Sequence, residues 1–354
     1  MRILVTGHRG YIGTVLTPML GAAGHDVTGL DIDLYRACSF PRDASLPPVK
    51  TISKDIRDLE VGDLAGFDAI IHLAGLSNDP LGEIDPNLTF AINHHATVRL
   101  AECARQAGVR RFLFASSCSN YGVAGDELVS EDWSLRPITA YGRSKVAAER
   151  DIARLAAAGM TVLSLRCATA FGDSPRLRFD LVLNNLVAWA CATGQIYLKS
   201  DGSAWRPLVH VKDIAQVFAA FLDAPAAAFA VGTCNVGSDG GNVRIRDLAD
   251  VVATAVPNSA ITFAPGAEPD KRSYRVDFAR LRRALPHFKP QWTVNAGAQS
   301  VAQLLIRMPI GTDEFEGVMY QRRAHLLARI KAGELDDELR SARGAPMKAK
   351  IVAS

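Results

Sequence analysis

A glycine-rich loop between a short apolar strand and an apolar helix is the feature that most constrains this fold. Gly7, Gly10 and Gly13 lie in TGHRGYIG, directly after the apolar residues 3–5 and before the apolar-periodic residues 15–20. Glycine lets the backbone turn tightly and approach a pyrophosphate, and the N-terminus of the following helix faces that anion. The pattern predicts an opening βα unit whose loop binds a dinucleotide.

The rest of the first half alternates between strand and helix patterns. Buried-strand patterns and helical spacing succeed one another at 26–30, 68–73, 90–107, 111–115, 141–158 and 161–165. Such alternation indicates βαβ units around a parallel sheet. We therefore predict an α/β fold, a Rossmann-type doubly wound parallel sheet. After Gly172 the pattern changes to a helix at 179–194, a return to the sheet at 209–223, and helix and loop from 242 onward, which predicts a smaller C-terminal α/β domain.

Acidic residues follow the predicted second and third strands. Asp31 comes 18 residues after Gly13, near the place where an acid binds the adenosine ribose hydroxyls. A carboxylate there repels a 2′-phosphate and favours NAD over NADP, although Arg9 in the loop argues for the opposite choice. Asp55 is placed to accept a hydrogen bond from the adenine amino group, whereas for Asp58 a solvated loop acid is a serious alternative.

A second group of residues has the composition of a proton-transfer site. Ser116 and Ser117 follow the predicted strand at 111–115, and Tyr141 and Lys145 share one helix face four residues apart. A phenol has a pKa of about 10, which a nearby ammonium and the nicotinamide charge lower. Tyr141 can then accept a proton from a sugar hydroxyl while Ser117 holds the same oxygen. An isolated YxxxK is common on surface helices, but the serine pair and the glycine loop favour the catalytic interpretation.

Composition narrows the classes of partner. A net charge of +3 is too small to indicate a nucleic-acid-binding protein. Six scattered cysteines without a CxxC pair disfavour a zinc site or a disulfide framework and fit a cytoplasmic protein. No apolar run reaches the roughly 18 residues of a membrane span. We expect no metal, no nucleic acid and no membrane partner.

The segments TGHRGYIG, HLAG, SSCSNYG and YGRSK together resemble the extended short-chain dehydrogenase/reductase family, in its NAD-dependent nucleotide-sugar epimerase/dehydratase branch. The resemblance covers roughly residues 1–290. It implies NAD as cofactor, a nucleotide sugar with UDP as the default nucleotide, and a homodimer packed through the helices at 90–107 and 141–158.

The resemblance also implies a division of the chain. Residues 1–172 and 207–236 would form the NAD-binding Rossmann domain, and residues 173–206 and 237–340 the nucleotide-sugar-binding domain. We expect 341–354 to be a flexible tail. Residues 300–340 extend past the usual end of the family and have amphipathic helical spacing. For them a packing or dimer element is preferred over a substrate lid.

Carried over by position, Tyr141 is the base, Lys145 its pKa partner and ribose ligand, and Ser117 the hydroxyl that binds the reacting oxygen. The resemblance implies cofactor contacts from Gly7, Gly10, Tyr11, Ile12, Gly13, Asp31, Asp55, Ile56, Leu73, Ala74, Gly75, Asn93, Tyr141 and Lys145. It implies substrate contacts from Ser117, Cys118, Ser119, Asn185, Leu186, Arg206, Asp270 and Arg272.

Two residues after Ser117 bear on the reaction. The family's 4,6-dehydratases carry an Asp-Glu pair there, whereas this chain has Cys118 and Ser119. This favours an NAD-dependent nucleotide-sugar 4-epimerase acting through a transient 4-keto sugar. The alternative is a 4-ketoreductase or dehydrogenase with net NAD(P)(H) turnover. Cys118 is interpreted as a neutral filler or, less favoured, a weak acid, and Arg176 and Arg178 suit either an acidic sugar or the diphosphate.

Overall fold

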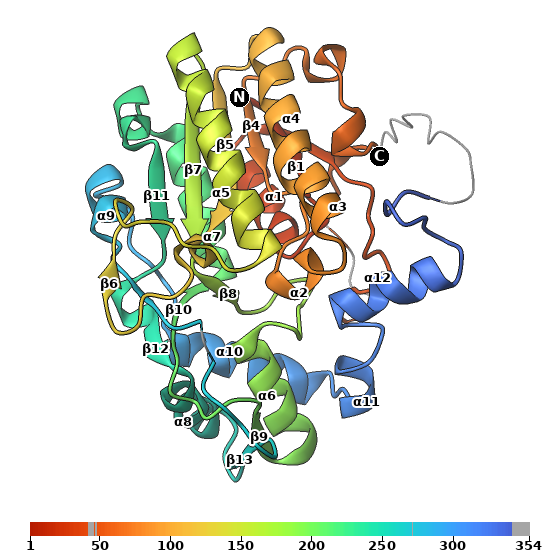
Figure 1. The fold of residues 1–354 in the computed structure, drawn as a ribbon, viewed down its shortest axis with the longest axis vertical. Helices are drawn as coiled ribbons and strands as arrows, with labels where there is room; N and C mark the ends of the chain where they lie inside the picture. The colour runs from red at the N-terminus through yellow and green to blue at the C-terminus, as the bar shows by residue number, and fades with distance from the viewer. Residues whose placement is uncertain (42–45, 47, 271, 342–354) are drawn as a thin grey trace.

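The computed structural model describes residues 1–41, 46, 48–270 and 272–341, and its centre is a parallel sheet of seven strands (Figure 1). In spatial order the strands are β11 (Thr233–Val236), β7 (Thr161–Cys167), β5 (Arg111–Ser117), β4 (Ala69–His72), β1 (Arg2–Thr6), β2 (Asp26–Leu30) and β3 (Lys50–Ile52). The chain builds β1 to β3 in one direction and then β4 to β11 in the other. This reversal opens a crevice at the carboxyl ends of β1 and β4. The predicted Rossmann-type fold is confirmed.

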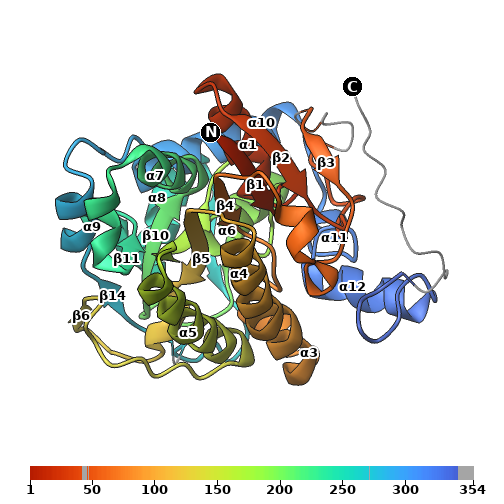
Figure 2. The same cartoon turned by 90° about the horizontal axis from the view of Figure 1, so that it is seen from above.

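Helices cover both faces of this sheet, as Figure 2 shows. Alternate residues of β1 explain why: Ile3 and Val5 join a buried cluster with α1 (Gly13–Ala22) and α7 (Val211–Asp223), while Leu4 faces the opposite cluster. Strands buried on both faces are characteristic of parallel sheets. The second face carries α2 (Asp79–Gly82), α3 (Pro86–Phe90), a π-helical turn (Ala91–His95), α4 (Ala96–Gln106) and α5 (Ala140–Ala153).

A second, smaller layer lies beyond the carboxyl ends of the sheet strands, at the bottom of Figure 1. Its helices are α6 (Val182–Thr193), α8 (Ile245–Ala255) and α10 (Val294–Arg307). Helix α9 (Ala279–Ala284) lies instead beside β11 of the large sheet, at the left of Figure 1. Its strands are β8 (Thr169–Phe171), β10 (Trp205–His210) and β12 (Asn242–Arg244) in one sheet, with the pairs β9 (Gln195–Leu198) and β13 (Ala260–Phe263), and β6 (Leu128–Val129) and β14 (Arg275–Val276). The expectation of only helix and loop after 242 is wrong, because short strands there pair with partners far away in sequence.

The C-terminal segment returns from this layer to the large sheet. It contains α11 (Thr312–Phe315) and α12 (Arg322–Lys331), and α12 contacts α2 (Figure 1). Leu326, Leu335 and Leu339 belong to the same buried cluster as Leu4. The segment thus packs on its own chain. The tail expected at 341–354 lies outside the described residues from 342 onward.

None of the described helices has the length and apolar character needed to cross a membrane.

Candidate functional site

A cavity of about 870 Å³ opens at the carboxyl ends of the sheet strands and extends under α6, β9 and β10. All predicted site residues line it except Asn93 and Cys118. Segments from both halves of the chain therefore meet around one cleft. The glycine loop, Asp31, the end of β5 and helix α5 all contribute residues to this cleft. Arg206 and Arg272, which were predicted to contact the substrate, line it as well.

The glycine loop is shaped for a close approach. Gly7 has φ +72°, a conformation that L side chains rarely adopt, and a Cβ on it would lie 2.7 Å from the backbone nitrogen of Ala74. A Cβ on Gly13 would lie 2.4 Å from the carbonyl oxygen of Gly7. The loop therefore runs directly against the segment after β4, and α1 begins with its N-terminus at the cleft. These features fit the pyrophosphate of a dinucleotide.

Asp31 directly follows β2 and lines the same cleft. Its carboxylate accepts hydrogen bonds from the backbone amides of Arg9 at 3.0 Å and Asp33 at 2.8 Å. The guanidinium of Arg9 pairs with Asp33 at 3.0 Å, and Arg176 pairs with the same carboxylate at 2.9 Å. Arg9 and Arg176 thus both pair with Asp33, two residues from Asp31. The carboxylate of Asp31 remains the group that would repel a 2′-phosphate.

Asp55 lines the cleft, but Arg57 engages its carboxylate. Arg57 Nε donates to Oδ1 at 3.0 Å, and Nη2 donates to Oδ2 at 2.7 Å. An adenine at this edge would therefore meet the backbone at 55–56 and the apolar Ile56 more readily than a free carboxylate.

The proton-transfer residues converge where β5 ends and α5 begins. Thr139 caps the helix, accepting a hydrogen bond from the amide of Gly142 at 3.1 Å, and this orients the first turn that carries Tyr141. The Tyr141 hydroxyl lies close enough to the Ser117 side chain for that contact to affect the tyrosine pKa. Lys145 Nζ donates to the carbonyl oxygen of Ala115 at 2.9 Å and lies 5.9 Å from the centre of the Tyr141 ring.

Burial dominates the electrostatics of this pair. It raises the pKa of Tyr141 above its ordinary value, an effect that the contact with Ser117 opposes and the charge of Asp79 reinforces. Burial also lowers the pKa of Lys145 to about 8. The expected lowering of the tyrosine pKa is therefore not found in the protein alone, because desolvation outweighs the ammonium. It would require the positive nicotinamide ring as well.

The two predicted residues outside the cleft have structural partners instead. Asn93 holds the backbone of Leu76, accepting from its amide at 2.8 Å and donating to its carbonyl at 2.9 Å. It therefore positions the loop after β4. Cys118 donates from Sγ to the carbonyl of Arg166 at 3.2 Å and is buried in the core, where burial raises its pKa. Neither side chain lines the cleft in this structure, so their predicted contacts with cofactor and substrate stay predictions. The burial of the Cys118 thiol favours the interpretation as a neutral filler over a weak acid.

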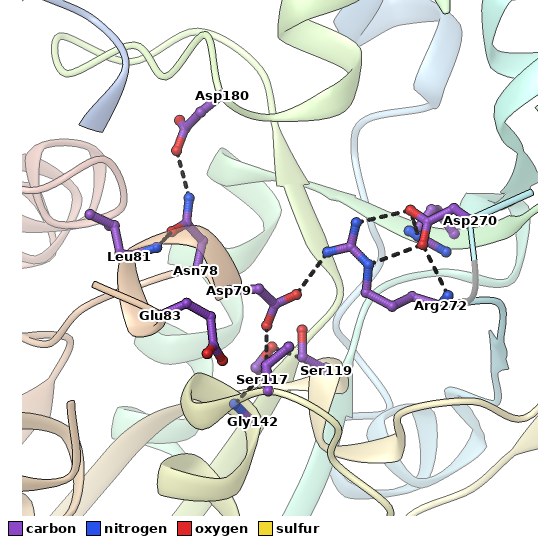
Figure 3. Close-up of polar contacts among 12 residues, drawn as sticks. Asn78, Asp79, Leu81, Glu83, Ser117, Ser119, Gly142, Asp180, Asp270 and Arg272 are labelled. Carbon is purple, nitrogen blue, oxygen red and sulfur yellow. Dashed lines mark hydrogen bonds and ion pairs between the residues drawn. The ribbon is translucent and has the colours of Figure 1, made fainter. Parts of the chain in front are cut away.

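On the substrate side, charged residues form a chain of ion pairs across the cleft (Figure 3). Arg206 pairs with Asp270 at 2.6 Å, and Arg272 pairs with Asp270 and with Asp79, both at 2.9 Å. Two guanidinium groups are thus held ready for an anion such as a diphosphate. Leu186 lines the cleft on α6, and Asn185 is tied to Glu316 at 3.0 Å.

The polar residues that line this cleft and that sequence reasoning missed include Asp79 and Arg322. A signal existed for Asp79, which follows HLAG closely at the carboxyl end of β4, where such sheets place ligands. Arg178 had been noted only as a basic residue at the pocket edge. Nothing local in the sequence marked Arg322.

Comparison with known proteins gives consistent matches. The model of the "NAD dependent epimerase/dehydratase family" matches residues 3–237. A UDP-glucose 4-epimerase of Mycolicibacterium smegmatis is 32% identical over 310 residues, covering 84% of this chain and 96% of that protein. The structure of MoeE5 in complex with UDP-glucose and NAD is 28% identical and covers 87% of this chain and 99% of its own, with a TM-score of 0.72. A Thermus thermophilus UDP-glucose 4-epimerase in complex with NAD, 24% identical over 88% of this chain and all of its own, shares the fold with a TM-score of 0.71.

Proposed function

The chain belongs to the NAD dependent epimerase/dehydratase family, and from this premise we propose that it is a nucleotide-sugar 4-epimerase. The family and its cofactor, NAD, were both predicted from the sequence and are confirmed. The proposal adds the reaction, inversion at carbon 4 through a transient 4-keto sugar, and UDP as the nucleotide. Relatives described as UDP-glucose 4-epimerases support both additions.

The observation that carries the proposal is the environment of the reacting oxygen. Ser117 and Tyr141 both line the cleft and interact with each other, Ser119 adds a neutral hydroxyl there, and Cys118 points into the core. Asp79 also faces the cleft, but its oxygens accept from Thr139 at 2.8 Å and Arg272 at 2.9 Å. Removal of water from the sugar would need a free acid and base, whereas oxidation and return at carbon 4 need only the phenol and its partners.

In this reaction the residues of the chain move one proton, that of the 4-hydroxyl of the sugar. NAD, when bound at the glycine loop, supplies the acceptor for the hydride at carbon 4 and the donor for its return. Tyr141 takes the proton of the 4-hydroxyl and gives it back after the keto sugar has turned its other face. Ser117 holds the same oxygen in both directions, and the Lys145 ammonium stabilises the phenolate form. Arg206 and Arg272 bind the diphosphate, so that the sugar can rotate while the nucleotide stays in place.

An NMR time course of the purified protein with UDP-glucose and no added cofactor tests the function. We expect UDP-galactose to appear and the two sugars to approach equilibrium, because NAD is regenerated in each turnover. The proposal is wrong if nothing happens until NADH or NADPH is added and a 4-keto sugar is then consumed, which would identify a ketoreductase. Loss of water from the sugar would identify a dehydratase.

Asp79 bears on which sugar is accepted. Its carboxylate stands beside Tyr141 in the cleft, and its positive partner, Arg272, is a proposed ligand of the diphosphate. Each carboxylate oxygen has a second lone pair, so Asp79 can meet the sugar while Thr139 and Arg272 stay bound to it. A neutral hexose can donate a hydroxyl to this carboxylate, whereas a hexuronate brings a like charge. We therefore propose a neutral hexose as substrate.

Asp79→Asn should accordingly relax this choice. We expect the wild-type kcat/KM for UDP-glucose to exceed that for UDP-glucuronate by about tenfold or more, and the ratio to fall several-fold in the variant. Glu268→Gln is the matched control, because it removes the same charge from an exposed position at the cleft rim. An unchanged ratio in Asp79→Asn, or an equal change in Glu268→Gln, would contradict the assignment.

The domain division predicted from the sequence and the homodimer remain proposals. Helices α4 and α5 lie side by side on one face of the large sheet (Figures 1 and 2). This arrangement offers a two-helix surface for a second copy.

A further inference from the structure

The C-terminal segment at 320–341, called here the C-terminal clasp, is fastened along the cofactor end of the cleft. The Tyr320 hydroxyl donates to the carbonyl of Ser39 at 3.2 Å, and Arg329 donates to the carbonyl of Leu34 at 2.6 Å. Arg340 makes a two-point ion pair with Asp58, at 2.6 and 3.0 Å. These anchors join residues about 280 positions apart, so the clasp closes over the loops that follow β2 and β3.

Within the clasp, the side chain of Arg322 is buried and forms no ion pair with any residue that the structure describes. Only 5% of the residue is exposed, and its guanidinium lies 3.9 Å from the centre of the Tyr35 ring while lining the cleft. Its Nη2 atom has no hydrogen-bond partner among the described residues. A buried guanidinium nitrogen without an acceptor is costly, which indicates that a ligand supplies one.

A second buried arginine shares this part of the cleft. Arg178 donates to Ser77 at 3.1 Å and forms a two-point ion pair with Asp180 at 2.7 and 2.9 Å. Asp180 also accepts from Asn78 at 2.7 Å (Figure 3). Arg178 and Asn78 therefore occupy the carboxylate of Asp180. The guanidinium of Arg322 forms no ion pair with it in the described part of the chain. Burial lowers the pKa of Arg322, and the nearby positive charge of Arg178 lowers it further. This is the electrostatic setting expected of two neighbouring cations that bind an anion.

The position of Arg178 and Arg322 indicates which anion they bind. Ser77, the partner of Arg178, follows Gly75 by two residues, and Gly75 lines the cleft at the carboxyl end of β4. Asn184 joins Arg178 to the glycine loop, because its amide donates to the carbonyl of Arg178 at 3.0 Å and to the hydroxyl of Tyr11 at 3.3 Å. The pair thus faces the loop where a pyrophosphate fits. A 2′-phosphate would instead lie at Asp31, whose charge repels it.

We propose that Arg322 binds the pyrophosphate of NAD from the side opposite the glycine loop, and that the C-terminal clasp retains the cofactor through turnover. Arg322 lies outside residues 3–237, which the family model matches. The proposal depends on NAD binding and is independent of which sugar reaction follows.

Release of NADH, followed by its fluorescence after mixing with excess NAD, tests the contact without any sugar. Arg322→Met keeps the length and apolar stem but removes the charge. We expect release about 10- to 100-fold faster, the effect of losing a charge-assisted hydrogen bond. Arg322→Lys should restore most of the retention. Lys331→Met, an exposed charge at the end of the same helix, should release NADH at the wild-type rate.

Two further measurements separate ligand binding from a structural role. The rise in thermal midpoint on saturation with NADH should be smaller in Arg322→Met, whereas a purely structural role would lower the midpoint equally with and without NADH. Arg340→Gln breaks the Asp58 anchor at a half-exposed site away from the cleft and should speed release several-fold. Unchanged release in both variants, or a defect seen with NADPH and not with NADH, would overturn the proposal.

Discussion

Replacing Tyr141 by phenylalanine is expected to lower kcat by about 10²- to 10⁴-fold, the usual contribution of a positioned acid–base group. The phenol lies at the cleft beside Ser117, and phenylalanine retains the ring but can neither take nor return the proton. The ring is 8% exposed, so its packing should be preserved. NADH should bind to the variant nearly as well as to the wild type.

The assay is the rate of interconversion of UDP-glucose and UDP-galactose, with NADH binding measured in parallel. Tyr197→Phe is the matched control, since Tyr197 lines the same cleft from β9 but packs against Trp189 of α6, with the two rings tilted by 38°. The control should retain activity within about threefold. Tyr141→Phe with more than a tenth of wild-type kcat would remove Tyr141 as the base.

Lys145→Met should abolish most activity and yet stabilise the fold at neutral pH. Burial lowers the Lys145 pKa from 10.5 to about 8. Below pH 8 the lysine is charged in both the folded and the unfolded chain, and burying that charge disfavours folding. The cost declines as pH rises from 8 to 10.5, because the folded protein releases the proton first. The shift corresponds to about 3 kcal/mol, less about 1 kcal/mol for the lost hydrogen bond to Ala115.

We therefore expect Lys145→Met to raise the free energy of unfolding by about 2 kcal/mol at pH 7, with the gain fading toward pH 10.5. Urea unfolding at pH 7 and pH 10 measures it. Lys212→Met is the control, because Lys212 is partly exposed and paired with Asp173 at 2.9 Å, and its loss should bring no such gain. Destabilisation at pH 7, or a gain independent of pH, would contradict the proposed state of Lys145.

Much of the site was accessible from the sequence because its determinants are local. The glycine loop, the acid after β2 and the i, i+4 pair of Tyr141 and Lys145 depend on short-range geometry. The carboxyl ends of parallel strands meet at one edge, so segments such as 115–119 and 73–75 were expected together. The reaction within the family could not be predicted from local sequence in the same way. Asp79, for example, acquires its partners Thr139 and Arg272 only when the chain folds.

What the sequence by itself determined is the order of elements, the Rossmann-type sheet, the cofactor and the positions of Ser117, Tyr141 and Lys145, since periodicity and spacing encode these. Only the tertiary structure decided the direction of individual side chains and the partners of distant ones. Cys118 turns into the core beside Ser117, and Arg322 reaches the cofactor end of the cleft from the far end of the chain. The physical reason is that desolvation and pairing depend on the whole packed neighbourhood, which no local spacing specifies.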